Sequence, residues 1–548
     1  MSVCKQCQSS FEVTDADRQF YDHIDAPEPT FCPQCRQQRR CAWRNERELY
    51  HRKCDLTGKQ IISIYSPDKP FPVYAQEEYW GDGWEGLDYG MKIDLEKPFF
   101  PQFAELMQKV PRLAIVNKQA ENSDYCNYSF ANKNCYLTFG NHYEEDCLYG
   151  HYSTKNKNCM DYFWTYASEL CYEVIYSKHC YKSVFLDHCE NASECYFSVD
   201  LKNCKNCIFS SSLRNKQYYI LNEPHTKEEY FKKLESFAFS GYERFQDAKQ
   251  FFLGDFRKRF PFRSIYQTNC ENCEGGSHEN CKNLRYSFDC TGCEDSAYGF
   301  QMDETYSSVD NTCTGYDRCE LCYESIGING AFNNMVCDSC WHSSDLNYCG
   351  FCFSSQNLFG CISLKHKKYC ILNKQYTQQE YEALVPKIIG SMQRHGEWGE
   401  FFPAIFSPFG YNETIAPYDF PMTRDEAKKR GWNWYDDFSA KSYKGVSYEI
   451  PNDIQDVPDD IVKQVLTCDV TKKPYKVIPQ ELKFYREIGI PVAHRSPAER
   501  HMDRIKLRNP RYLWDRECTK CNKAIQTTYA PERPETVLCE ECYLNEVY

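Results

Sequence analysis

The chain repeats itself at two offsets, and this repetition constrains its fold more than any other feature. Shifted by 464 residues, its two ends align without a gap, so that Cys4 meets Cys468 and Cys54 meets Cys518. Shifted by 151 residues, ELCYE at 169–173 meets the same pentapeptide at 320–324. One small module therefore begins and ends the chain, and the middle consists of two related copies.

The middle of the chain holds most of the 35 cysteines. Between residues 126 and 189 successive cysteines are nine or twelve apart, so up to Cys180 every second one returns after 21 or 24 residues, a spacing typical of stacked repeats. Runs rich in Tyr, Phe and Ser separate them, and Asn or Asp precedes several, as turns require. We therefore predict a mainly β protein with two tandem parallel β-helix (solenoid) segments, whose cysteines point inward as small apolar side chains.

Helix signals follow each predicted solenoid. Thr226 with Glu229 and Thr377 with Glu380 match the capping box, and a shorter helix is expected after Thr423. A helix at the end of each solenoid covers the last exposed edge. The predicted divisions are an N-terminal zinc-ribbon module (1–75), a connector with a short helix (76–120), the first solenoid with its capping helix (121–240), a connector (241–265), the second solenoid with its capping helix (266–393), an aromatic strap and acidic linker (394–465) and a C-terminal zinc-ribbon module (466–548).

Two groups of paired cysteines predict metal sites in the terminal modules. Two Cys-x2-Cys knuckles supply four thiolates, which suit a tetrahedral zinc ion with Zn–S distances of about 2.3 Å. All four ligands are thiolates, so we expect two structural Zn²⁺ ions. The predicted ligands are Cys4, Cys7, Cys32 and Cys35 at one end and Cys518, Cys521, Cys539 and Cys542 at the other.

The 464-residue alignment predicts that each module has lost one of two ancestral sites. The positions that match the first site in the C-terminal copy are Cys468, Thr471, Ser496 and Glu499. The positions that match the second site in the N-terminal copy are Cys54, Thr57, Ala75 and Glu78. We expect Cys54 and Cys468 to be packing remnants without metal.

Further metal in the cysteine-rich middle is an open alternative to internal packing. Several Cys-x2-Cys pairs occur there, and two of them, offset by 20 residues, predict a candidate third site. Its ligands are Cys270, Cys273, Cys290 and Cys293.

Arginines also align at the 464-residue offset and suggest a helical face. Arginine clusters on small zinc modules bind phosphates, which predicts contact with RNA or the ribosome. The alternative is pairing with acidic neighbours such as Glu46 and Asp503, or with the acidic middle. The aligned candidates are Arg36, Arg40, Arg44 and Arg47 with Arg500, Arg504, Arg508 and Arg511.

Composition and motifs narrow the function class. The chain has a net charge of −13, no long apolar run and no secretory signal in MSVCKQCQSS, so we expect a cytoplasmic protein with reduced thiols and no membrane partner. It contains no phosphate-binding glycine loop, His-Glu-x-x-His or Gly-x-Ser-x-Gly motif. The pair His179-Cys180 and the run Asp187 to Cys189 are the only candidate nucleophile groups, and neighbouring residues on a strand face apart. The motifs favour no enzyme.

Eight segments resemble a family of large zinc-ribbon proteins from uncultured bacteria with small genomes. They are FCPQCRQQRR, RKCDLTGKQIISIYSPDKPF, ENSDYCN, ELCYE, KKYCILNKQYT, GEWGEFFP, SPFGYNET and TTYAPERPE. The resemblance covers nearly the whole chain and implies the zinc knuckles of both ends. It implies no activity, although some members carry a CoA-transferase label.

Taken together, these patterns predict a zinc-binding, non-enzymatic scaffold whose solenoid surfaces bind protein partners, with RNA or ribosome contact through the arginine rows. Two alternatives stay open. One is an enzyme, carbohydrate-active or other, on a β-helix groove, which needs clustered exposed carboxylates. The other is a self-assembling structural protein.

Overall fold

The computed structural model describes residues 1–313, 319–327, 329–436 and 448–548. All predicted site residues lie within these ranges, whereas part of the predicted aromatic strap lies outside them. None of the helices in these ranges combines the length and the apolar character that a membrane span needs.

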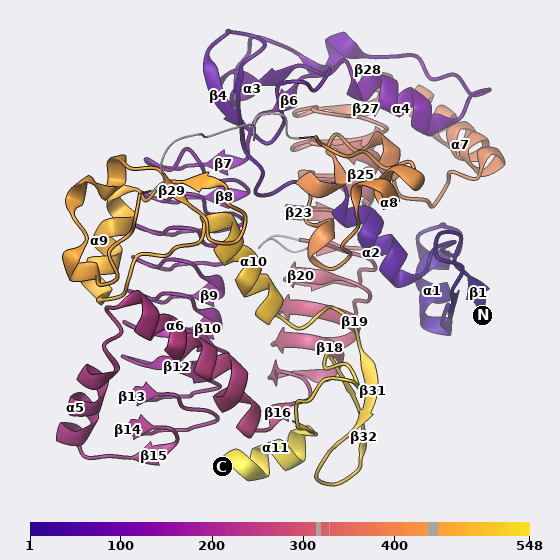
Figure 1. Cartoon of the computed structure of the whole chain (residues 1–548). Helices are drawn as coiled ribbons and strands as arrows, with labels where there is room; N and C mark the ends of the chain where they lie inside the picture. The colour runs from indigo at the N-terminus through magenta and orange to yellow at the C-terminus, as the bar shows by residue number, and fades with distance from the viewer. Residues whose placement is uncertain (314–318, 328, 437–447) are drawn as a thin grey trace.

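Two stacks of short parallel strands form the middle of the molecule (Figure 1). The first stack comprises β7 (Asn117–Lys118), β8 (Ser129–Phe130), β9 (Phe163–Tyr166), β10 (Ile175–Lys178), β11 (Val184–Asp187), β12 (Tyr196–Val199), β13 (Lys205–Ile208), β14 (Gln217–Ile220) and β15 (Glu223–Pro224). The second comprises β17 (Gln267–Thr268), β18 (Glu271–Glu279), β19 (Lys282–Thr291), β20 (Phe300–Asp303), β21 (Thr305–Tyr306), β22 (Cys319–Glu320), β23 (Asn329–Phe332), β24 (Met335–Asp338), β25 (Trp341–Gly350), β26 (Gln356–Phe359), β27 (Lys368–Ile371) and β28 (Lys374–Gln375).

The stacks lie side by side and run in opposite directions. In Figure 1 the first descends from β7 to β15, and the second ascends from β18 to β28. Lys178 Nζ on the first stack lies 2.8 Å from Glu279 Oε1 on the second. Nearby, Tyr176 donates a 3.2 Å hydrogen bond to Asp289.

The predicted mainly β fold with two solenoids is wrong. Helices account for 26% and strands for 28% of the structure, and the strands fall into many small sheets that form no closed solenoid. Most parallel neighbours in the stacks are offset by 12 residues and not by the predicted 21 or 24: Ile175 pairs with Phe163 on one side and Asp187 on the other. The short offset arises because a left-handed residue recurs at every third position, for example at Trp164, Ala167 and Leu170, and turns the chain.

Helices follow both stacks where the capping boxes predict them. α5 (Lys227–Phe237) begins after Thr226 and α7 (Gln378–His395) after Thr377, each with both capping-box hydrogen bonds. β15 and β28 turn back antiparallel on the last strands, so each stack ends in a hairpin. The predicted short helix is α8 (Arg424–Lys429), capped by Thr423. Two further helices, α4 (Phe99–Met107) and α6 (Tyr242–Phe251), connect the parts.

The two terminal modules contain the same elements in the same order. The N-terminal module has β1 (Ser2–Val3), β2 (Ser10–Phe11), α1 (Asp15–His23), α2 (Pro33–Cys41), β3 (Tyr50–Lys53), β4 (Gln60–Ser63), β5 (Val73–Tyr74) and α3 (Gln76–Trp80). The C-terminal module has β29 (Leu466–Thr467), β30 (Pro474–Tyr475), α9 (Pro479–Ile488), α10 (Pro497–Leu507), β31 (Trp514–Glu517), β32 (Ala524–Thr527), β33 (Val537–Leu538) and α11 (Glu540–Val547). Every strand and helix begins 464 residues after its counterpart.

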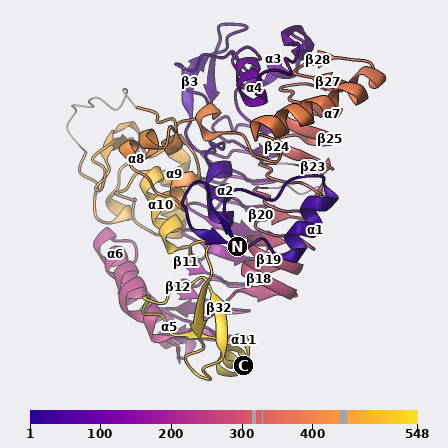
Figure 2. The same cartoon turned by 90° about the vertical axis from the view of Figure 1, so that its right-hand side faces the viewer.

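The modules dock crosswise on the stacks. Figure 2 shows α1 and α2 of the N-terminal module against the second stack, where Arg36 of α2 binds Asp310. In Figure 1, α10 of the C-terminal module lies on the first stack, where Arg500 binds Asp161. The two ends of the chain therefore each pack on the stack that is more distant in sequence.

Candidate metal centres

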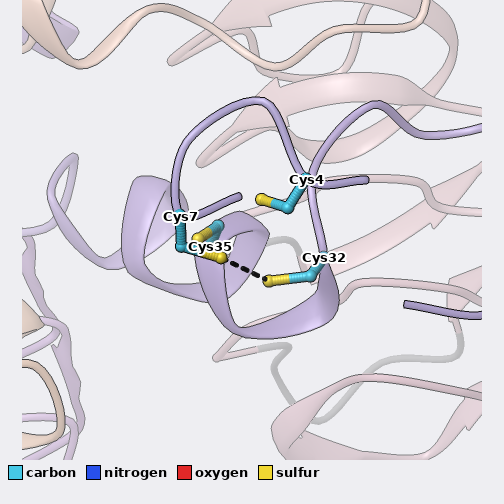
Figure 3. A group of neighbouring side chains, drawn as sticks. All are labelled: Cys4, Cys7, Cys32 and Cys35. Carbon is cyan, nitrogen blue, oxygen red and sulfur yellow. Dashed lines mark hydrogen bonds between the residues drawn. The ribbon is translucent and has the colours of Figure 1, made fainter. Parts of the chain in front are cut away.

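The first cysteine group joins a hairpin turn to the start of a helix. Cys4 and Cys7 lie in the turn between β1 and β2, where the backbone N–H of Gln8 donates to the carbonyl of Cys4 at 3.0 Å. Cys32 is the N-cap of α2, and Cys35 lies on its first turn. The four sulfur atoms all lie within 4.8 Å of one another and converge in Figure 3. This arrangement confirms that the predicted ligands come together and can hold one metal ion.

The surroundings of this group favour a thiolate at Cys32. The side chain of Cys35 donates to Cys32 and, against the effect of burial, lowers the pKa of Cys32 to about 5. The N-terminus of α2 adds a positive dipole end at the same place. Cys7 is exposed, so one edge of the group faces solvent. A tetrahedral thiolate set of this kind fits Zn²⁺.

The second group repeats this construction. Cys518 and Cys521 lie in the turn between β31 and β32, and Cys539 is the N-cap of α11 with Cys542 on its first turn. The four sulfur atoms again lie within 4.8 Å of one another. Burial raises the pKa of Cys518, but hydrogen bonds from backbone N–H groups, that of Cys539 first, outweigh it and lower the pKa to about 6. This group can also hold one metal ion.

The positions that match a lost metal site keep the local backbone arrangement of the site but lack most of its cysteine ligands. In the C-terminal module Ser496 takes the place of a thiol as the N-cap of α10, accepting a hydrogen bond from the backbone of Glu499 at 3.4 Å. In the N-terminal module the backbone N–H of Ala75 donates to Cys54 Sγ at 3.4 Å. Within the described residues neither Cys54 nor Cys468 belongs to a group of three metal ligands. Both cysteines are buried in apolar clusters of their modules.

The predicted third site of Cys270, Cys273, Cys290 and Cys293 does not form a compact group. Within the described part of the chain, only the two terminal groups have ligand atoms mutually within 4.8 Å. The reason is the short offset of 11 to 12 residues between neighbouring layers, which places Cys281 between two of the predicted ligands: its side chain contacts both Cys270 and Cys293. Spacing alone could not reveal this, because the assumed repeat was too long.

The aligned arginines are inside the molecule. Arg36 and Arg40 share Asp310, with N–O distances of 2.7 and 3.0 Å, and Arg500 and Arg504 share Asp161 at 2.7 and 2.8 Å. Arg44 lies 2.5 Å from Glu46, Arg508 lies 2.5 Å from Asp419, and Arg511 binds Asp289 and Asp419. Arg47 stacks on the ring of Phe139 at 4.6 Å. These contacts favour the alternative in which the arginines pair within the protein.

The candidate nucleophile group spans the end of β11, and its thiol and imidazole have different partners. Cys189 is buried, and its sulfur contacts the carbonyls of Asp187 and Ser198 at 3.4 and 3.9 Å. His188 Nδ1 instead lies 2.5 Å from Asp187 Oδ1, and its ring stacks on Tyr266 at 3.7 Å. The thiol and the imidazole therefore do not form a Cys–His pair.

Comparison of the chain with models of known protein families and with curated proteins gives no match. The resemblance to zinc-ribbon proteins of small-genome bacteria therefore stays a prediction.

Proposed function

We propose that the protein is a non-enzymatic scaffold in which two structural Zn²⁺ ions hold the terminal modules, and the modules fix two cysteine-rich stacks side by side. The outer faces of the stacks are then free to bind protein partners. Zinc serves folding and not catalysis, because four thiolates fill its coordination shell and leave no position for water or substrate.

One observation carries this proposal: each docking helix directs two arginines at one buried aspartate of the distant stack. Asp310 and Asp161 are both fully buried, as are Arg40 and Arg504. A buried carboxylate that loses its cation is strongly destabilised, so each module is needed for its stack and each stack for its module. The first metal group lies at the start of α2, directly before Arg36.

The same contacts argue against a nucleic-acid role for the arginine rows. Phosphate binding needs cationic side chains that reach the surface. Seven of the eight aligned arginines have a carboxylate within the protein.

Zinc analysis and affinity capture test the proposal. Purified protein is expected to hold zinc, with one ion lost in Cys7→Ser and another in Cys521→Ser, whereas the matched control Cys54→Ser keeps the wild-type content. Affinity capture from extract, with and without nuclease, then tests the partner. Protein partners that resist nuclease and require both zinc ions support the scaffold, and partners that nuclease removes would overturn it in favour of RNA binding.

A further inference from the structure

The second stack contains a ring of four buried cysteines that lies apart from both terminal groups. β24 pairs in parallel with β25, and this register places Cys337 beside Cys349. The bridge between Trp341 and Phe353 continues the same 12-residue offset, so Cys340 lies beside Cys352. Two Cys-x2-Cys pairs are therefore stacked directly on each other.

The four sulfurs contact one another around a closed ring. Cys337 contacts Cys340 and Cys349, and Cys352 contacts the same two cysteines from the opposite corner. All four residues are fully buried. Elsewhere in the described residues a Cys-x2-Cys pair meets fewer thiols in the next layer: Cys273, for example, lies beside Leu284. The ring differs in that each of its four thiols has two others of the ring as neighbours.

The chemistry of the ring matches a soft cation. The apolar cluster around it consists of cysteines and leucines. The backbone N–H groups of Cys349 and Leu364 lower the pKa of Cys337 and Cys352, respectively, against the effect of burial. N–H donors of this kind stabilise thiolates, and four thiolates in an apolar interior need a positive charge among them. Thiolate sets select d10 ions such as Zn²⁺ and Cu⁺.

We propose that Cys337, Cys340, Cys349 and Cys352 bind a third metal ion, a soft d10 cation, inside the second stack. Among the described residues, only the terminal groups have sulfurs that all lie within 4.8 Å of one another, so the sulfurs of the ring are more widely spaced. With Zn–S distances of about 2.3 Å, a tetrahedral ion requires the sulfurs to lie roughly 3.8 Å apart. Binding therefore draws the four sulfurs closer together through rotation of the cysteine side chains.

Counting the metal in the full-length protein tests this proposal. Protein is loaded with Zn²⁺ alone, freed of excess ion, and weighed intact by native mass spectrometry. Three zinc ions per wild-type chain are expected, and two in Cys340→Ser. The matched control is Cys361→Ser, because the Cys361 thiol contacts Cys349 but is no corner of the ring; this variant should keep three ions.

The terminal sites are counted separately, so the two proposals fail in different ways. Cys7→Ser and Cys521→Ser should each remove one ion whether or not the ring binds metal. Two ions in the wild type, both lost when these two changes are combined, would overturn the ring and leave the terminal sites intact. One ion that persists in the combined variant and disappears with Cys340→Ser would support the ring. The wild-type count decides even if Cys340→Ser does not fold.

Discussion

Replacing Asp310 with alanine tests the crosswise docking most directly. Asp310 is fully buried and accepts from Arg36 Nε at 2.7 Å, while Arg40 Nη1 lies 3.0 Å from its other oxygen. The variant leaves two buried guanidinium groups without their counter-charge. Breaking a buried ion pair in this way costs about 3–5 kcal/mol. Arg36 keeps the carbonyl of Phe31 and Arg40 keeps the hydroxyl of Thr312, so we expect the lower part of this range.

The assay is hydrogen exchange of the amides in α2, which reports the local free energy of undocking. A loss of about 3 kcal/mol speeds exchange by roughly two powers of ten, since about 1.4 kcal/mol is a factor of ten. Asp161→Ala is the matched control, because Asp161 holds Arg500 and Arg504 of α10. Asp310→Ala should act on α2, and Asp161→Ala on α10. Less than a tenfold change in α2, or an equal change in both helices, would refute the docking argument.

Four further predictions concern single positions. Burial raises the pKa of Asp303 to about 7, so protonation of this carboxyl favours the folded state. This contribution to the unfolding free energy is lost as the pH rises through 7. Asp303→Asn should therefore remove about 1 kcal/mol of the decline in unfolding free energy between pH 6 and 8, as measured by urea unfolding. Gly275→Ala should cost several kcal/mol in the same assay, because φ is 140° and a Cβ atom would lie 1.6 Å from the carbonyl of Ser287. Gly58→Ala, at φ 75° with nothing within 4 Å, should cost only about 1 kcal/mol. Cys54→Ser should leave zinc content unchanged, as measured by metal analysis.

Short sequence motifs correctly predicted the features that depend on residues close together in the chain, namely the two metal groups and two helix starts. Knuckle spacing identified both metal groups, because the ligands of each group come from two short turns. The capping boxes at Thr226 and Thr377 identified two helices for the same reason, since the bonds that define them span three residues. The 464-residue alignment also carried over to the order of the elements.

The 12-residue layer could not be read from residue types. Left-handed backbone favours Asn and Asp, and Asn134 and Asp146 do adopt it. However, Phe185, Leu170 and Lys182 adopt it equally, because stacking against the neighbouring layers fixes their conformation. The sum of two successive cysteine steps therefore predicts a layer of 21 or 24 residues, although a single step of twelve is itself the repeat.

The pattern of charged residues in the sequence likewise does not show whether a charged side chain is buried or exposed. Arg36 and Arg40 are four residues apart and suggest an exposed basic face. Their partner, Asp310, lies on a strand stack that is distant in sequence, so only the tertiary structure shows that the face is buried. The sequence correctly suggested that carboxylates of the acidic middle pair with the arginines, but it does not show which carboxylates do so.

The two modules should respond differently to loss of zinc, although their folds match. In the N-terminal module Cys32 and Cys35 begin α2, so the metal and the docking helix are one unit. In the C-terminal module the docking helix α10 is capped by Ser496, whose hydroxyl is worth about 1 kcal/mol, and the metal group holds α11 instead. Structural zinc contributes far more, about 10–16 kcal/mol in isolated zinc-finger peptides. Chelation should therefore speed hydrogen exchange in α2 and α11 and spare α10. Loosening of α10 together with α2 would mean that the modules depend on each other and not on their own metal.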